Sequence, residues 1–103
     1  MKYKKGITVI ICSLNSEKDL SGLIESVLKQ TLKPNQIIIT DGGSSDNTKE
    51  IAKKYKYLFI ESKPGFYVQL TNAIPKILYD TVLRVEMDHR YPTDFLENFY
   101  KKH

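Results

Sequence analysis

The sequence is poor in cysteine and has no long apolar run. Cys12 is the single cysteine, which excludes an internal disulfide, and no Cys/His cluster suggests a zinc site. One free cysteine fits a reducing compartment, so we expect a cytoplasmic protein. The longest apolar run, residues 7–12, is far shorter than the ~20 residues of a transmembrane helix. We therefore expect no membrane span. The basic residues 1–5 precede a strand rather than the apolar core of a signal peptide.

Two common nucleotide-binding signatures are also missing. The chain has no Gly-x-x-x-x-Gly-Lys-Ser/Thr phosphate loop and no Gly-x-Gly-x-x-Gly turn. These absences argue against P-loop hydrolases and against the usual NAD-binding proteins. Much of the net charge of +4 comes from lysines near the two ends, and no basic helix is interleaved with aromatic residues. We therefore expect no nucleic-acid partner.

The length and composition are those of one domain. At 103 residues, of which 41% are hydrophobic, the chain can bury a core. Apolar β-branched runs bounded by turn residues predict four strands, and apolar residues at helical spacing predict helices between them. The predicted strands are residues 7–12, 36–40, 58–61 and 81–85, and the predicted helices are residues 17–30, 47–55, 66–73 and 94–100.

Specific signals mark two of the helix ends. Ser16 is the expected N-cap of the first helix, with Asp19 at its third helical position. Pro75 cannot sit in a helix interior without the loss of a hydrogen bond. It therefore predicts either a kink after residue 73 or a fresh helical start over residues 76–79.

Alternation of strands and helices predicts an α/β fold with a Rossmann-like parallel sheet. Right-handed crossovers give the strand order 3-2-1-4, with helices on both faces. The carboxyl ends of strands one, two and four then share one edge, where open α/β sheets bind ligands. The polar residues that follow these strands are Ser13, Asn15, Asp41, Glu86 and Asp88. This convergence is the strongest functional signal in the chain.

The most distinctive stretch is residues 37–48, Ile-Ile-Ile-Thr-Asp-Gly-Gly-Ser-Ser-Asp-Asn-Thr. Three β-branched residues indicate a buried strand, and Asp41 stands at its carboxyl end. Gly42 and Gly43 allow a tight turn before residues that favour a helix N-cap. The stretch therefore predicts an acid held at the ligand-binding edge. The plainer alternative is an ordinary strand-to-helix turn with a capping aspartate.

A second acidic feature is Glu86-Met87-Asp88. In an extended chain, side chains two residues apart share a face, so both carboxylates would point the same way. Two such acids can hold a hard divalent cation whose shell is completed by phosphate oxygens. The alternative is a polar loop with two solvated acids. His89 and Arg90 could reach a phosphate, although a plain surface pair is the simpler interpretation, and Cys12 is expected to be a small buried apolar residue.

Several stretches together resemble the family 2 glycosyltransferases of GT-A fold. They are residues 7–15, 26–31, 38–48 and 84–88, which cover nearly the whole chain in the right order. Residues 84–95 are most similar to the branch that includes succinoglycan-type exopolysaccharide transferases. The resemblance implies that residues 1–103 form a single nucleotide-sugar-binding domain, the N-terminal half of a GT-A fold. It also implies inverting transfer of a sugar from a nucleotide diphosphate donor, commonly a UDP-sugar.

Carried over by position, the resemblance implies roles for five residues. Ser13, Asn15 and Asp41 would hold the nucleotide base and nearby groups. Glu86 and Asp88 match the family's Asp-x-Asp motif, which contacts the ribose and a divalent metal, Mg²⁺ or Mn²⁺. The first acid is glutamate here instead of aspartate, and its longer side chain can change the ribose contact.

Other departures bear on the acceptor side. Leu14 stands where an aromatic residue is frequent, and residues 75–80 replace an Ala/Gly-rich segment. Family members continue beyond the position of residue 103, with the acceptor site and the general base. We therefore expect a domain truncated at its C-terminus, with no residue assignable as the catalytic base. The acceptor stays open between a glycan, a lipid and a protein.

Two further expectations follow from the half-fold. A non-catalytic nucleotide-binding or scaffold module that kept this half-fold is the alternative function, and a plain α/β domain without a ligand is a third. The fourth strand would be an exposed edge with apolar neighbours, which is a template for pairing. We therefore expect self-association through that strand.

Overall fold

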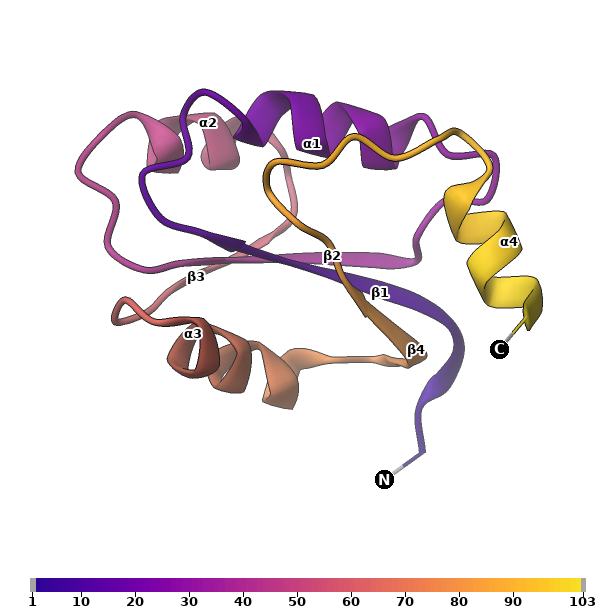
Figure 1. Ribbon diagram of the computed structural model, residues 1–103. Coiled ribbons are helices and arrows are strands. Elements are labelled where there is room, and N and C mark those ends of the chain that lie inside the picture. The colour runs from indigo at the N-terminus through magenta and orange to yellow at the C-terminus, as the bar shows by residue number, and fades with distance from the viewer. Residues whose placement is uncertain (1, 103) are drawn as a thin grey trace.

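A four-stranded parallel sheet lies between helices in the computed structural model, which describes residues 2–102 (Figure 1). The strand order is β3-β2-β1-β4, and all three pairings are parallel. The predicted order 3-2-1-4 is therefore confirmed. The elements are β1 Lys4–Ser13, α1 Leu20–Leu28, β2 Gln36–Asp41, α2 Thr48–Lys54, β3 Leu58–Glu61, α3 Phe66–Ala73, the 3-10 helix η1 Ile74–Lys76, β4 Tyr79–Arg84 and α4 Phe95–Lys102.

Helices cover both faces of the sheet, as predicted. The larger core lies on the face of α1 and α2, where α1 contributes Leu20, Leu23, Ile24 and Val27. The smaller core lies on the face of α3 and contains Ile10, Ile38 and Ala73. Because β1 is central and buried on both faces, its apolar run is nearly continuous, which is typical of parallel sheets.

The first helix is shorter at both ends than the predicted residues 17–30. It begins at Leu20, and the residue at the N-cap position is Asp19 rather than Ser16. Ser16 does not cap α1, because its hydroxyl exchanges hydrogen bonds with the backbone of Leu14 and its N–H donates to Thr48 Oγ1 at 2.7 Å. The hydroxyl that would cap the helix is thus used within the loop after β1, and the distant Thr48 holds the backbone of Ser16.

Pro75 marks a fresh helical start, which was one of the two predicted outcomes, but the helical turn spans residues 74–76 rather than the predicted 76–79. The helix α3 ends at Ala73, and η1 follows immediately with the proline in its first turn. The strand β4 spans Tyr79–Arg84 instead of the predicted residues 81–85, so Val85 follows the strand. Among residues 2–102, no helix combines the length and the apolar character needed to span a bilayer.

Candidate functional site

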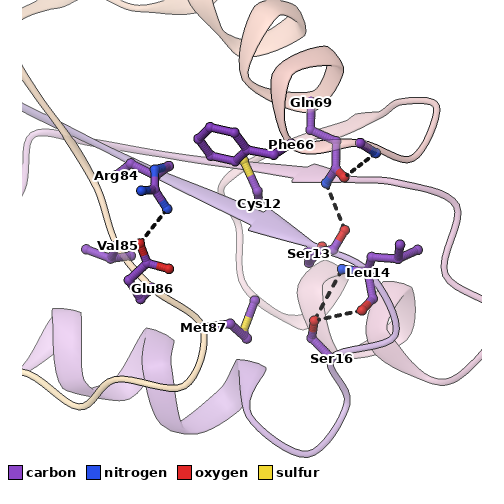
Figure 2. A pocket seen from close by; sticks show the side chains of 11 residues that line it. Cys12, Ser13, Leu14, Ser16, Phe66, Gln69, Arg84, Val85, Glu86 and Met87 are labelled. Carbon is purple, nitrogen blue, oxygen red and sulfur yellow. Dashed lines mark hydrogen bonds and ion pairs between the residues drawn. The ribbon is translucent and has the colours of Figure 1, made fainter.

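A cavity of about 360 Å³ opens at the carboxyl edge of the sheet (Figure 2). Its walls come from the end of β1 and the following loop, the start of α3, and the end of β4 with the following loop. The lining residues are Cys12, Ser13, Leu14, Ser16, Gly65, Phe66, Gln69, Arg84, Val85, Glu86 and Met87. The cavity therefore lies at the edge where the sequence predicts ligand binding.

Asp41 organises the end of β2 from a fully buried position. One of its carboxylate oxygens accepts hydrogen bonds from the hydroxyls of Ser13 at 2.8 Å and Ser44 at 2.6 Å. The other accepts the backbone N–H groups of Gly43 at 3.1 Å and Ser44 at 2.8 Å. Burial raises the pKa of Asp41, but these hydrogen bonds together hold the pKa below the ordinary aspartate value. The carboxylate is thus charged, and both of its oxygens are engaged within the protein.

Asn15 joins the loop after β1 to the loop after β2. Its backbone N–H donates to Ser44 Oγ at 2.8 Å, and its side-chain Oδ1 accepts the N–H of Ser45 at 2.8 Å. The residue has φ of 48°, in the left-handed region that asparagine tolerates better than most residues. Asn15 is exposed at this junction and is therefore accessible to a ligand, whereas Ser13 is buried at the cavity wall.

The same two loops are also joined one step further along the chain. The N–H of Ser16 donates to Thr48 Oγ1 at 2.7 Å, and the N–H of Glu17 donates to Asp46 Oδ2 at 3.3 Å. Asp46 in turn accepts the N–H of Thr48 at 2.9 Å. The polar residues of the distinctive stretch therefore fix the position of the first loop, and not only their own turn.

Gln69 belongs to this site, and sequence reasoning missed it. Its Nε2 donates to the carbonyl oxygens of Ser13 at 2.9 Å and Thr40 at 2.8 Å, and its Oε1 accepts the N–H of Gly65 at 3.2 Å. A Cβ on Gly42 would lie 2.7 Å from Gln69 Oε1, so this close approach requires glycine. The sequence signal that could have indicated Gln69 is its place four positions before Ala73, since residues at this spacing share a helix face and Ala73 is buried.

Glu86 lines the cavity, whereas Asp88 lies outside it. A Glu86 carboxylate oxygen is 2.7 Å from Arg84 Nη1, and the Arg84 guanidinium lies 4.5 Å from the centroid of the Phe66 ring (Figure 2). The side chain of Asp88 is 83% exposed, and its Oδ1 is 3.1 Å from Nδ1 of His89. Both carboxylates are therefore open to solvent, on the same loop after β4.

The expectation that Glu86-Met87-Asp88 is extended is wrong. The N–H of His89 donates to the carbonyl oxygen of Glu86 at 3.2 Å, which closes a four-residue turn with Met87 and Asp88 at its tip. The shared face of an extended chain therefore does not align the two acids. Within residues 2–102, no group of three or more His, Cys, Asp or Glu side chains could hold a metal ion. Any metal held by Glu86 and Asp88 would need oxygens from a ligand or water.

Two other residues considered from the sequence have clear positions. Arg90 donates to backbone carbonyls and to Asp19, so its guanidinium is engaged within the protein. Cys12 is half-buried beside the smaller core, and burial raises the pKa of its thiol. It is therefore a protonated packing residue at the cavity wall, in agreement with the expectation.

The structure thus brings part of the predicted set together. Ser13 and Asp41 are in direct contact, and Asn15 is joined to the same turn through Ser44. Glu86 shares the cavity with Ser13, and its loop extends to Asp88. The contacts of these residues with a nucleotide or a metal stay predictions.

Comparisons with known proteins agree with this architecture. Residues 8–103 match the family model for glycosyl transferase family 2. The chain is 48% identical over 62 residues to a cholesterol galactosyltransferase of Borreliella burgdorferi; the match covers 58% of this chain and 17% of that protein. The chain therefore spans about a sixth of that relative's length.

Solved structures show the same fold. TarS of S. aureus, residues 1–349 in complex with UDP-GlcNAc, superposes with a TM-score of 0.76 at 26% identity. The match covers 95% of this chain and 30% of the TarS chain. Glucosyl-3-phosphoglycerate synthase of Mycobacterium tuberculosis, in complex with Mn²⁺, UDP and glucosyl-3-phosphoglycerate, gives a TM-score of 0.71 at 21% identity, over 82% of this chain and 34% of its own. At that identity the second likeness shows the fold alone. The sheet order, the carboxyl-edge cavity and the family match lead to one conclusion: the chain belongs to glycosyl transferase family 2 and has the N-terminal half of its GT-A fold.

Proposed function

We propose that this chain is the donor-binding domain of an inverting glycosyltransferase and binds a nucleotide diphosphate sugar, most simply a UDP-sugar. The observation that carries the proposal is the cavity at the carboxyl edge, where the loop held by Asp41 faces the loop that carries Glu86. Family membership and the UDP-GlcNAc complex of the TarS relative support a nucleotide-sugar ligand. In this proposal the chain is one such domain, and it spans only part of the length of the relatives that it matches.

The nucleoside part of the donor lies, in this proposal, against the loop after β1. Ser13 and Asn15 contact the base and nearby groups. Asp41 does not contact the nucleoside directly, because both of its oxygens are already engaged. It positions Ser13 and the turn that begins with Gly42 and Gly43. Glu86 contacts the ribose and shares in metal binding with Asp88.

The residues present fit a divalent metal of the hard, oxygen-binding kind, Mg²⁺ or Mn²⁺. Glu86 and Asp88 supply two accessible carboxylates, with side chains 47% and 83% exposed. Without a cation these carboxylates would repel a diphosphate, so donor binding should be weak in its absence. When bound, the metal offsets the charge that develops on the leaving diphosphate.

A general base and an acceptor site are not assigned to any residue of this chain. We therefore expect donor binding with little or no transfer by the chain alone. The acceptor stays open between a glycan, a lipid and a protein. A non-catalytic nucleotide-binding or scaffold module is the alternative function, and transfer to an acceptor by the complete protein separates the two. A cytoplasmic location is proposed on the single free cysteine alone.

Calorimetric titration of the chain with UDP, in Mn²⁺ and in chelator, tests the proposal. We expect clear binding in Mn²⁺ and at least about tenfold weaker binding in chelator, because the carboxylates then repel the diphosphate without a bridging cation. Glu86→Gln should weaken the binding in Mn²⁺. The matched control is Glu50→Gln, an exposed acid on α2 away from the cavity, which should bind as wild type does. Absence of UDP binding under both conditions would overturn the proposed function.

A further inference from the structure

The guanidinium of Arg90 spans the tip of the acidic turn. Its Nη1 donates to the carbonyl oxygen of Met87 at 3.0 Å and to that of His89 at 2.8 Å. These two carbonyls flank Asp88 in the chain, whose own side chain projects into solvent. Arg90 therefore binds the backbone on both sides of the acid that is proposed to hold the metal.

The other side of the same guanidinium is bound to α1. Its Nη2 donates to the carbonyl oxygen of Asp19 at 3.0 Å and lies 3.3 Å from Asp19 Oδ1. Asp19 occupies the N-cap position of α1, directly after the loop that carries Ser13 and Asn15. Arg90 thus connects the acidic turn to the helix that follows the nucleoside-side loop.

Gly22 makes this connection possible. A Cβ at this position would lie 2.7 Å from both Nε and Nη2 of Arg90, which is closer than real Cβ contacts. The guanidinium therefore lies directly against the helix backbone. Nothing in the local helix pattern requires glycine at position 22, and glycine weakens a helix interior. Glycine at this position leaves the space that the Arg90 guanidinium occupies.

The base of the turn is fixed by a different residue. The N–H of Glu86 donates to the Tyr91 hydroxyl at 2.9 Å, and the Tyr91 ring packs against Phe95 with centroids 4.7 Å apart. Glu86 is therefore held through Tyr91, and the hydrogen bonds of Arg90 act on the tip. The four N–H bonds of the two terminal nitrogens are directed at Met87, His89 and Asp19, so these terminal groups are not free for a phosphate.

We propose that Arg90 is a positioning residue for metal-dependent donor binding. It fixes the tip of the turn, which carries Asp88, against α1, while Tyr91 holds Glu86 at the cavity. This inference rests on the proposed function. Arginine is needed because its rigid planar fork reaches acceptors on two elements at once, whereas the single ammonium of lysine cannot. Substitution of a residue that holds a metal ligand in place typically lowers metal affinity by roughly ten- to a hundredfold.

Three variants test the role in calorimetric titrations with UDP, in Mn²⁺ and in chelator. Arg90→Lys keeps the charge but loses the fork, and Gly22→Ala places a methyl group where the guanidinium lies. We expect both variants to lose about tenfold in UDP affinity in Mn²⁺ and to bind as wild type in chelator. The matched control is Ser21→Ala, an exposed neighbour on α1, which should bind as wild type under both conditions.

A second readout separates positioning from general stability. Titration of Mn²⁺ in the presence of UDP, followed by electron paramagnetic resonance, should show weaker metal binding by both variants. Their thermal unfolding midpoints should stay within a few degrees of wild type. Wild-type metal affinity in Arg90→Lys and Gly22→Ala would overturn the inference. Equal losses in Mn²⁺ and in chelator would also overturn it, because they indicate a structural role. UDP binding by wild type that is independent of Mn²⁺ would instead overturn the metal assignment of the proposed function, and the role of Arg90 with it.

Discussion

At the scale of single residues, the site depends on polar side chains whose partners are distant in sequence. Asp41 is the clearest case, because its four hydrogen bonds join the end of β1, the end of β2 and the start of the following turn. A buried charged carboxylate is stable only with such partners. Its alteration should therefore disturb both the fold and the nucleoside side of the cavity.

Replacement of Asp41 by alanine should weaken UDP binding equally in Mn²⁺ and in chelator. The change leaves the hydroxyls of Ser13 and Ser44 and two backbone N–H groups without their acceptor, so the loop after β1 loses its fixed position. Calorimetric titration with UDP measures the effect. The control is Asp94→Ala, which removes an exposed carboxylate on the C-terminal side of the site. A loss confined to the Mn²⁺ titration would place Asp41 at the metal instead.

The depressed pKa of Asp41 also predicts how stability depends on pH. Its folded pKa lies below the unfolded value of about 3.9, so its stabilising contribution is fully present above that pH and is lost as the pH falls through the folded pKa. Asp41→Asn should lower the free energy of unfolding at neutral pH by about 2 kcal/mol. It should also flatten the dependence of stability on pH below about 4. Urea unfolding of both proteins from pH 2 to pH 7 measures both effects, and parallel curves would contradict this role.

Asp88 provides the residue-scale test of the metal. Asp88→Asn removes one charge from an exposed side chain and leaves the turn intact, so stability should change by less than about 0.5 kcal/mol. UDP affinity in Mn²⁺ should fall to the value measured in chelator. Calorimetry in both buffers provides the measurement, and Asp94→Asn is the matched control on the same loop. Metal dependence that survives in Asp88→Asn would remove Asp88 from the metal site.

At the scale of elements, helices and strands were predictable where a periodic apolar pattern determines them. The stripe of Leu20, Leu23, Ile24 and Val27 gave the buried face of α1, and β-branched runs gave β1 and β2. The ends of α1 were not predictable. At its start, the Ser16 hydroxyl bonds to Leu14 instead of capping the helix, and the Ser16 N–H bonds to Thr48, 32 positions away. At the other end, Gln30 donates to the carbonyl oxygen of Pro92 at 2.6 Å and accepts the N–H of Leu96 at 2.9 Å. Tertiary contacts of this kind have no local signature.

The candidate site shows the same division. Its location follows from topology, since the carboxyl ends of β1, β2 and β4 meet wherever the order is 3-2-1-4. Its contacts do not, because Arg90 and Gln69 bond to main-chain oxygens whose positions only the folded chain determines. The prediction that Glu86 and Asp88 share a face assumed an extended chain. The turn at Met87 and Asp88 does not meet that condition.

Gln69 provides the test at the scale of elements, since it joins α3 to the ends of both central strands. Gln69→Leu leaves the carbonyl oxygens of Ser13 and Thr40 without this donor in a buried position. We expect the free energy of unfolding to fall by at least about 2 kcal/mol. Urea unfolding measures the loss. The control is Asn72→Ala on the same helix, whose exposed hydrogen bond to Ser62 should cost less than about 1 kcal/mol. Equal losses for the two variants would contradict the special role of Gln69.

At the scale of the whole molecule, the sheet has one edge at β3 and one at β4. Exposed apolar residues lie on β4 and in the segment before it. Val82 is 43% exposed on the strand itself, and the segment before the strand exposes Leu78 at 53% and Ile74 at 50%. An edge strand next to such a surface is a template for pairing with another chain.

We therefore predict that the chain self-associates through β4, with a mass that rises with concentration in light scattering. Val82→Lys should shift the distribution toward the monomer, because a charged residue on an edge strand opposes both burial and pairing. Leu58→Lys, which places the same charge on the opposite edge at β3, is the matched control, since Leu58 is 40% exposed there. If Leu58→Lys separates the chains and Val82→Lys does not, the contact is at β3. A wild-type chain that stays monomeric at millimolar concentration would show that neither edge pairs, and that the surface around Val82 tolerates water without a partner.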